Sequence, residues 1–319
     1  NFPFTPTFIQ VLGKIKDAAA RANNKLKLLP TNKQRAISKA AKEVWQNKHG
    51  KQFPIDVFQT GSGTSTNMNA NEVIANLASK YSKLDINPND DVNMSQSSND
   101  VIPTAMHCAY FVDTAEKLMP AMDLLIDTIA KKIKQYHGVV KTGRTHLMDA
   151  MPLTIDQELG AWNTQLLNAR ASLITVLDAL RFLPQGGTAV GTGINAHPRF
   201  AREFCKAISP LVGFKAETSN DYFRNLSSQD LSVQLSGELK NLAVILMKIS
   251  NDLRWMNSCG PLAGIAEVEL QALQPGSSIM PGKVNPVIPE AVAMAGADVI
   301  GNDVTVTVAA QSGLSLIHI

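Results

Sequence analysis

Residues 276–286 read Gly-Ser-Ser-Ile-Met-Pro-Gly-Lys-Val-Asn-Pro, and they are the most informative stretch of the chain. Two hydroxyls, one ammonium group and one carboxamide stand close together among only three side chains suited to burial. The glycines and prolines predict a loop, and such loops often close a site over a small ligand. We interpret Lys283 and Asn285 as groups that neutralise and orient a carboxylate, and Ser277 or Ser278 as groups for proton transfer. A solvated connecting loop is the alternative.

The composition is that of an ordinary globular protein. The chain has 319 residues, of which 45% are hydrophobic and 18% charged, with a net charge of +3. Its basic residues are scattered, which argues against a nucleic-acid partner. Cys108, Cys205 and Cys259 are far apart and form no metal-binding motif, so we expect no disulfide framework, no metal and no cofactor.

No uninterrupted apolar run has membrane-spanning length and no signal peptide is visible, so we expect a cytoplasmic protein that does not enter a membrane. The chain starts at Asn1 without Met. An organelle matrix therefore stays open as a second location.

Apolar residues recur at spacings of three and four in three long segments, which predicts amphipathic helices that pack as a bundle. Thr154 and Gln157 resemble a capping box before the second of these helices. A bundle formed by several chains and a monomeric helical domain both fit this pattern. The three stripes are Leu118, Met122, Leu125, Ile129, Ile133 and Tyr136; Trp162, Leu166, Ala169, Leu173, Val176, Leu180 and Leu183; and Leu231, Leu235, Leu239, Leu242, Leu246, Ile249, Leu253 and Met256.

Polar segments rich in Gly, Ser, Thr and Asn separate the helices and are interpreted as loops. They cover residues 59–69, 85–100 and 184–198. Polar residues before predicted helices at 69–77 and 101–112 suggest that the first two segments hold an anion at a helix N-terminus. Ordinary helix capping is the alternative.

Residues 141–150 form a further predicted loop, which holds two cations, two threonines, a histidine and an aspartate. His146 is the histidine in this polar setting, and imidazole can act as an acid or a base near neutral pH. A structural or merely exposed histidine is the alternative reading.

Together these segments resemble the fumarase/aspartase superfamily, and within it the class II fumarate hydratases. The matching stretches agree in order and spacing, and GSSIMPGKVNP at 276–286 is the superfamily signature. The others are GSGTSTNMNANE at 61–72, SQSSNDVIPTAMH at 95–107, TGRTHLMDAMPLT at 142–154 and GGTAVGTGINAHP at 186–198.

The resemblance implies an all-α fold whose long central helices form a bundle shared by four subunits. It implies an N-terminal lyase domain at 1–98, a central helical domain at 99–313, and a tail at 314–319 that does not match the family. It also implies a hydro-lyase that interconverts fumarate and L-malate, as in the tricarboxylic acid cycle, without a metal or organic cofactor. In this family each active site of the homotetramer is assembled from three chains.

The resemblance also implies a role for individual residues. Ser277 would remove the C3 proton of malate, and Lys283 with Asn285 would stabilise the resulting aci-carboxylate. His146, held by Glu290, would activate the water. The residues implied to bind the substrate dicarboxylate are Ser62, Gly63, Thr64, Ser97, Ser98, Asn99, Thr145, Ser278, Val284 and Asn285.

Two departures from the family pattern stand out. A second, non-catalytic dicarboxylate site commonly begins His-Pro-Asn-Asp, whereas here the positions are Asn87, Pro88, Asn89 and Asp90. Relatives also extend beyond both ends of this chain, so we expect a truncated gene or a foreign tail. Aspartate ammonia-lyase is the nearest alternative function, although His146 stands where aspartases typically carry Gln. An inactive fragment of a fumarase is the other alternative.

Overall fold

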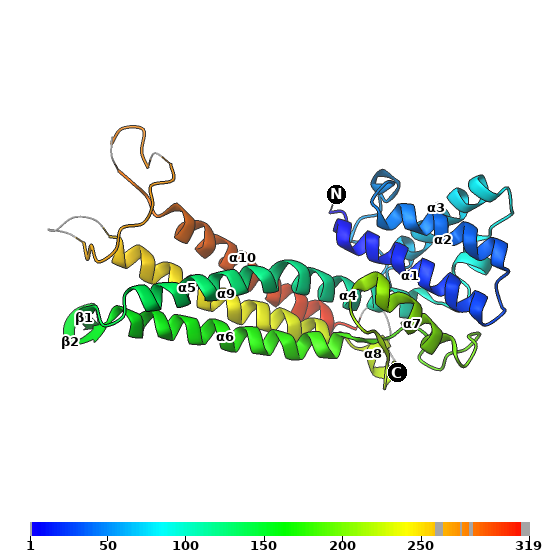
Figure 1. Ribbon diagram of the computed structural model, residues 1–319. Coiled ribbons are helices and arrows are strands. Elements are labelled where there is room, and N and C mark those ends of the chain that lie inside the picture. Colours follow the sequence, from blue (N-terminus) through cyan, green and yellow to red (C-terminus); the bar gives the residue numbers. More distant parts are fainter. Residues whose placement is uncertain (1, 259–263, 275, 281–282, 314–319) are drawn as a thin grey trace. The chain divides into compact units, whose positions relative to one another are not determined.

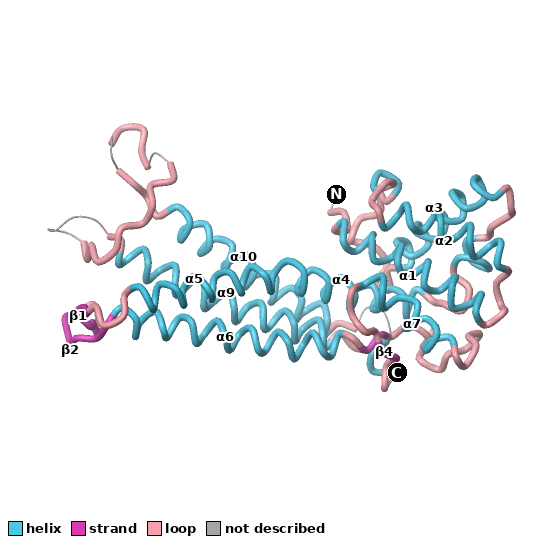
Figure 2. The backbone as a smooth tube through the Cα atoms, in the orientation of Figure 1, coloured by secondary structure: helices cyan, strands magenta, loops and turns pink. Residues whose placement is uncertain are grey.

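The computed structural model describes residues 2–258, 264–274, 276–280 and 283–313, and helices dominate it (Figures 1 and 2). The predicted all-α class is confirmed, with two small two-stranded sheets added. The α-helices are α1 (Pro6–Lys25), α2 (Thr31–Trp45), α3 (Thr64–Ser82), α4 (Ser98–Asp113), α5 (Met119–Gln135), α6 (Ile155–Leu180), α7 (Phe200–Val212), α8 (Tyr222–Ser227), α9 (Asp230–Met256) and α10 (Val287–Gln311). Shorter helical turns are Gly50–Gln52, Pro88–Val92 and Thr114–Leu118, and the strands are β1 (Val140–Thr145), β2 (Met148–Thr154), β3 (Phe182–Leu183) and β4 (Glu217–Thr218).

The chain folds into two compact units. The first unit comprises Asn1–Leu118, Val176–Leu231 and Ala309–Ile319, and the second comprises Met119–Thr175 and Ser232–Val308. Helix α4 packs with the N-terminal helices of the first unit. The expected tail at 314–319 lies outside the described residues.

Helix α1 is the centre of the first unit, where it contacts α2, α4 and α7. Small side chains let its neighbours approach closely. A Cβ on Gly13 would lie 2.9 Å from the Trp45 backbone nitrogen, so glycine permits the α1–α2 contact. Leu12, Ile15 and Ile37 are fully buried in this core, and each such side chain contributes about 1.5–3 kcal/mol on burial.

Helices α5, α6, α9 and α10 form the second unit (Figure 1). The apolar stripe predicted along α6 is confirmed, since Trp162, Leu166 and Leu173 are at most 3% exposed. Polar contacts also join neighbouring helices. Arg170 of α6 pairs with Asp123 of α5 at 2.5 Å, and Lys240 of α9 pairs with Asp303 of α10 at 2.6 Å.

The expected loop at residues 141–150 is instead part of an antiparallel hairpin, β1–β2. His146 and Leu147 form its two-residue turn with φ angles of 55° and 61°. Two positive φ angles match the twist of such hairpins, but glycine or asparagine usually supplies them, so this sequence gave little sign of the turn. A bulge lies between Thr142 and Arg144. Gly143 fits it because a Cβ there would come within 2.2 Å of the Met151 carbonyl oxygen.

Helix α10 leaves apolar side chains exposed, including Ile288, Met294 and Val304. By length and composition alone it could cross a membrane, a test that the core helix of a soluble protein also passes. Asp303 and its partner Lys240 make it a poor membrane segment, because buried charge in lipid is costly.

Candidate functional site

An open cleft of about 500 Å³ lies in the first unit, where the N-termini of α3 and α4 meet a third segment. Thr64 comes from α3, Ser97–Asn99 come from the start of α4, and the third segment contributes residues 188–195. The structure therefore brings together three of the segments that the sequence analysis singled out. Further residues that line the cleft are Asn93, Ser95 and Gln96.

Asp100 organises this cleft. It forms a capping box with Ser97 at the start of α4, and its carboxylate accepts hydrogen bonds from the backbone N–H groups of Gly186 and Thr188, both at 2.9 Å. The Asn99 side chain adds a hydrogen bond from its Nδ2 to the Ala189 carbonyl at 2.8 Å. Burial raises the pKa of Asp100 to about 6, against the opposing effect of these backbone donors.

The start of α3 depends on Gly63, which has a φ of 66°. A Cβ at this position would lie 2.9 Å from Ile102 Cγ1, so a larger residue would meet both strain and crowding. Beside it, the Ser62 and Thr64 hydroxyls are 2.8 Å apart and share a hydrogen bond. Backbone N–H groups and hydroxyls gathered at two helix N-termini favour an anionic ligand.

Lys16 of α1 lies fully buried behind this cleft, and sequence reasoning missed it. Its Nζ donates to Asn67 Oδ1 at 2.8 Å and to Asn93 Oδ1 and Gln96 Oε1, both at 3.0 Å. Burial lowers the pKa of Lys16 to about 7, although Asp100 opposes this shift. The sequence feature that could have predicted its burial is its position four residues after Leu12, on the buried face of α1.

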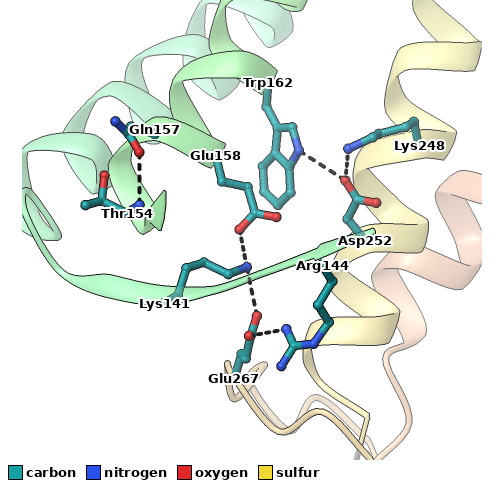
Figure 3. Close-up of polar contacts among 9 residues, drawn as sticks. All are labelled: Lys141, Arg144, Thr154, Gln157, Glu158, Trp162, Lys248, Asp252 and Glu267. Carbon is teal, nitrogen blue, oxygen red and sulfur yellow. Dashed lines mark hydrogen bonds and ion pairs between the residues drawn. The ribbon is translucent and has the colours of Figure 1, made fainter. Parts of the chain in front are cut away.

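Thr145 and His146 lie at the tip of the hairpin in the second unit, and both are exposed. Ion pairs tie the hairpin to a segment ahead of the 276–286 loop (Figure 3). Glu267 accepts from Arg144 Nη1 at 2.5 Å and pairs with Lys141 Nζ at 2.8 Å. Lys141 also pairs with Glu158 of α6 at 2.5 Å.

The helix behind the hairpin is secured by its own polar contacts. The Thr154 N–H donates to Gln157 Oε1 at 3.0 Å, which is one half of the predicted capping box (Figure 3). Farther along α6, Trp162 Nε1 donates to Asp252 of α9 at 3.2 Å, and Asp252 also pairs with Lys248. The hairpin that carries His146 is therefore attached to a well-anchored helix.

The described part of the 276–286 loop folds back on itself. The Gly276 N–H donates to the Lys283 carbonyl at 3.0 Å, and Asn285 Nδ2 donates to the Gly276 carbonyl at 2.9 Å. A Cβ on Gly276 would approach the Lys283 carbonyl oxygen to 2.2 Å, so only glycine fits this contact. The Ser277 hydroxyl oxygen accepts a hydrogen bond from the Ile279 N–H at 3.3 Å.

The remaining predicted residues of this region are near the loop or at the start of α10. Ser278, Lys283 and Val284 are exposed, whereas Glu290 in the first turn of α10 is half-buried. Across the described residues, no hydrogen bond or ion pair connects His146 with Ser277, Lys283 or Glu290. The predicted residues thus belong to three segments, namely the cleft of the first unit and, in the second unit, the hairpin tip and the 276–286 loop.

The proposed second dicarboxylate site has a structural use in this chain. The Asn87 side-chain oxygen caps the turn Pro88–Val92 by accepting from the N–H groups of Asn89 at 2.8 Å and Asp90 at 3.0 Å. Asn89 and Asp90 are themselves exposed.

His107, Cys108 and Cys205 are further ionisable residues that the structure buries. His107 is buried, with Nδ1 3.1 Å from the Phe182 carbonyl, and burial lowers its pKa to about 4. Cys108 and Cys205 are buried free thiols. The described residues contain no cluster of His, Cys, Asp and Glu suited to a metal ion.

Comparisons with known proteins decide the family. A protein-family model described as "Lyase" matches residues 1–301. "Fumarate hydratase class II 2" of Pseudomonas aeruginosa is 54% identical over 318 residues, which cover 98% of this chain and 69% of that protein. The chain belongs to the class II fumarate hydratase family. "Fumarate hydratase class II" of Mycobacterium tuberculosis is 48% identical over 319 residues, covering 98% of this chain and 67% of that relative.

Solved structures of class II fumarate hydratases and related lyases agree with the fold. The recombinant class II fumarase of Schistosoma mansoni superposes with a TM-score of 0.95 at 38% identity, covering 99% of this chain and 70% of that one. The "fumarate lyase:delta crystallin" of Brucella melitensis gives a TM-score of 0.91 at 44% identity, covering 96% and 68%. The predicted fumarase/aspartase-type fold is therefore confirmed.

Proposed function

We propose that this chain is a fumarate hydratase subunit that adds water reversibly to fumarate and gives L-malate. The cleft of the first unit is the observation that carries the proposal. Two helix N-termini and the hydroxyls of Thr64, Ser97 and Ser98 converge on it. This arrangement suits one carboxylate of a small dicarboxylate, because the donors are fixed before the ligand arrives.

In the proposed chemistry, water adds across the double bond of fumarate. His146, with Glu290, takes a proton from the water as its oxygen bonds to C2. The electron pair of the double bond moves to C3 and its carboxylate, which becomes the aci-carboxylate that Lys283 and Asn285 stabilise. Ser277 then gives a proton to C3. In reverse, the Ser277 oxygen removes that proton, and its hydrogen bond from Ile279 favours the charged form that this requires.

We place the remaining predicted residues around the substrate. Ser62, Gly63 and Asn99 belong to the cleft segments, and Thr145 precedes His146 at the hairpin tip. Ser278 and Val284 come from the same loop as Ser277. For Asn87, Pro88, Asn89 and Asp90 we propose no role in the reaction itself; the Asn87 side chain caps this turn.

We further propose that four copies assemble and that each active site draws its three groups of residues from three chains. Two observations support this. Among the described residues of one chain, no hydrogen bond or ion pair joins His146 to Ser277 or Lys283. Apolar side chains of α10, such as Met294, remain exposed. Burying that face in a bundle of several chains would remove it from water. We propose a cytoplasmic enzyme without a metal or organic cofactor.

Proton NMR of the purified protein with fumarate and ammonium in D₂O tests the function. Deuterated malate is the expected product, whereas deuterated aspartate would favour an ammonia-lyase. The Ser277→Ala and His146→Asn variants should each reduce kcat by about 10²–10⁴-fold while their Tm stays close to that of the wild type. An unchanged kcat in either variant would contradict the assigned role.

Mixing these two inactive variants tests the shared site. If Ser277 and His146 of one active site come from different chains, random reassembly restores about a quarter of the sites. If one chain supplies both, no activity returns. Each variant dissociated and reassembled alone is the matched control.

A further inference from the structure

We propose that Lys16 is a positioning residue that sets the direction of the hydrogen bonds in the cleft, so that the Ser98 hydroxyl donates toward a substrate carboxylate. This inference rests on the proposed function, since it concerns the same cleft. Lys16 does not line the cleft itself. It acts through the Asn67 side chain, which lies between the Lys16 ammonium group and Ser98.

The direction of these bonds follows from chemistry. Lys16 Nζ donates to the side-chain oxygens of Asn67, Asn93 and Gln96, so all three oxygens face it. In its protonated form, below about pH 7, this group can only donate hydrogen bonds. The Asn67 Nδ2 group then points away from Lys16, and it donates to Ser98 Oγ at 2.9 Å and to Asn93 Oδ1 at 3.3 Å. Because Ser98 Oγ accepts from Asn67, its own proton is directed elsewhere. Ser98 lines the cleft, so that proton is available to a carboxylate there.

The same arrangement fixes the other amides. Gln96 Nε2 donates to the carbonyls of Val92 and Met94, both at 3.0 Å, and Asn93 Nδ2 donates to the Gln96 carbonyl at 3.3 Å. The turn that leads into α4 is therefore held around one buried cation. Lys16 also contributes positive charge behind the cleft, partly offset by Asp100 on α4.

The Lys16→Met variant is the first test, because methionine keeps much of the side-chain volume without the donors. The probes are fumarate in turnover and succinate as an unreactive dicarboxylate, both at a pH below about 7, where Lys16 is protonated. We expect the KM for fumarate and the inhibition constant of succinate to rise about tenfold or more, with kcat changed less than about threefold. Lys14→Met is the matched control, since it removes the same charge from a partly exposed position on the same helix. It should leave both constants within about twofold.

The Asn67→Asp variant separates positioning from support of the fold. An aspartate still accepts from Lys16, so the ammonium group stays paired and the Tm should hold. The second carboxylate oxygen cannot donate, however, so the Ser98 hydroxyl would donate to it instead of to the substrate, and the charge of Lys16 would be cancelled. A merely structural Lys16 network predicts an unchanged KM, whereas our inference predicts a rise comparable to that of Lys16→Met.

The outcomes are distinct. If Asn67→Asp raises the KM for fumarate and the inhibition constant of succinate while its Tm is unchanged, the inference is supported, even if Lys16→Met fails to fold. If both constants in Asn67→Asp stay within about twofold of the wild-type values, the inference is overturned. An equal rise of the two constants in Lys14→Met also overturns it. If wild-type protein neither turns over fumarate nor binds succinate, the proposed function is overturned and this inference falls with it.

Discussion

Lys16 should make the free energy of unfolding rise with pH above neutrality. Its pKa falls from the usual 10.5 to about 7 in the folded protein, chiefly because burial disfavours the charged form. Between these values the folded protein holds Lys16 largely neutral, whereas the unfolded chain holds it protonated. Unfolding therefore takes up a proton, and stability increases with pH across this window. The gain from about pH 7 to about pH 9 amounts to about 2 kcal/mol.

Urea unfolding at several pH values between about 7 and 9, at one fixed protein concentration, measures this effect. Lys16→Met should lack the rise, so the difference in unfolding free energy between it and the wild type should itself change with pH. Asp100 does not interfere, because its folded pKa of about 6 lies below the window. Lys14→Met should follow the wild-type curve. Parallel curves for wild type and Lys16→Met would refute the reasoning.

Three further predictions concern the same two units. Gly63→Ala should destabilise the protein by about 2 kcal/mol in urea unfolding, since its φ is 66° and its Cβ would crowd Ile102; Gly160→Ala, where a Cβ meets nothing within 4 Å, should not be destabilised. Glu267→Gln removes the shared partner of Lys141 and Arg144, so it should lower the free energy of unfolding by about 1 kcal/mol and reduce kcat. Asp149→Asn breaks only an exposed 3.5 Å contact with Arg144 and should change neither quantity. Asp100→Asn loses an acceptor for buried backbone N–H groups and should cost about 2 kcal/mol in thermal or urea unfolding and weaken succinate binding.

The helices of the second unit could be predicted because burial on one face leaves a regular trace in the sequence. Leu166 and Leu173 are fully buried, as the spacing along α6 predicted. The hairpin left no such trace. Its strands are largely exposed and show no regular alternation of apolar and polar residues. Its turn uses His146 and Leu147 in a conformation that usually needs glycine or asparagine.

The cleft could be predicted only in part. Ser97 and its neighbours were recognisable as polar residues before a helix, which suggested both capping and anion binding. The link from Asp100 to Gly186 spans 86 residues, and no local pattern encodes it. Lys16 escaped notice because lysine is almost never fully buried unless it is paired. Its partners are themselves remote in sequence, so the pairing became visible only in three dimensions.

The division of the chain into two units has a consequence for its synthesis. The first unit needs residues 176–231 as well as residues 1–118, and the second unit is interrupted by that same stretch. The last of the N-terminal helices, α4, therefore leaves the ribosome about a hundred residues before α7 completes their core, a wait of roughly 5–20 s at typical elongation rates. During that interval the buried faces of α1 and α4 lack part of their cover. Protection of the nascent chain by chaperones should matter most between the emergence of α4 and that of α7.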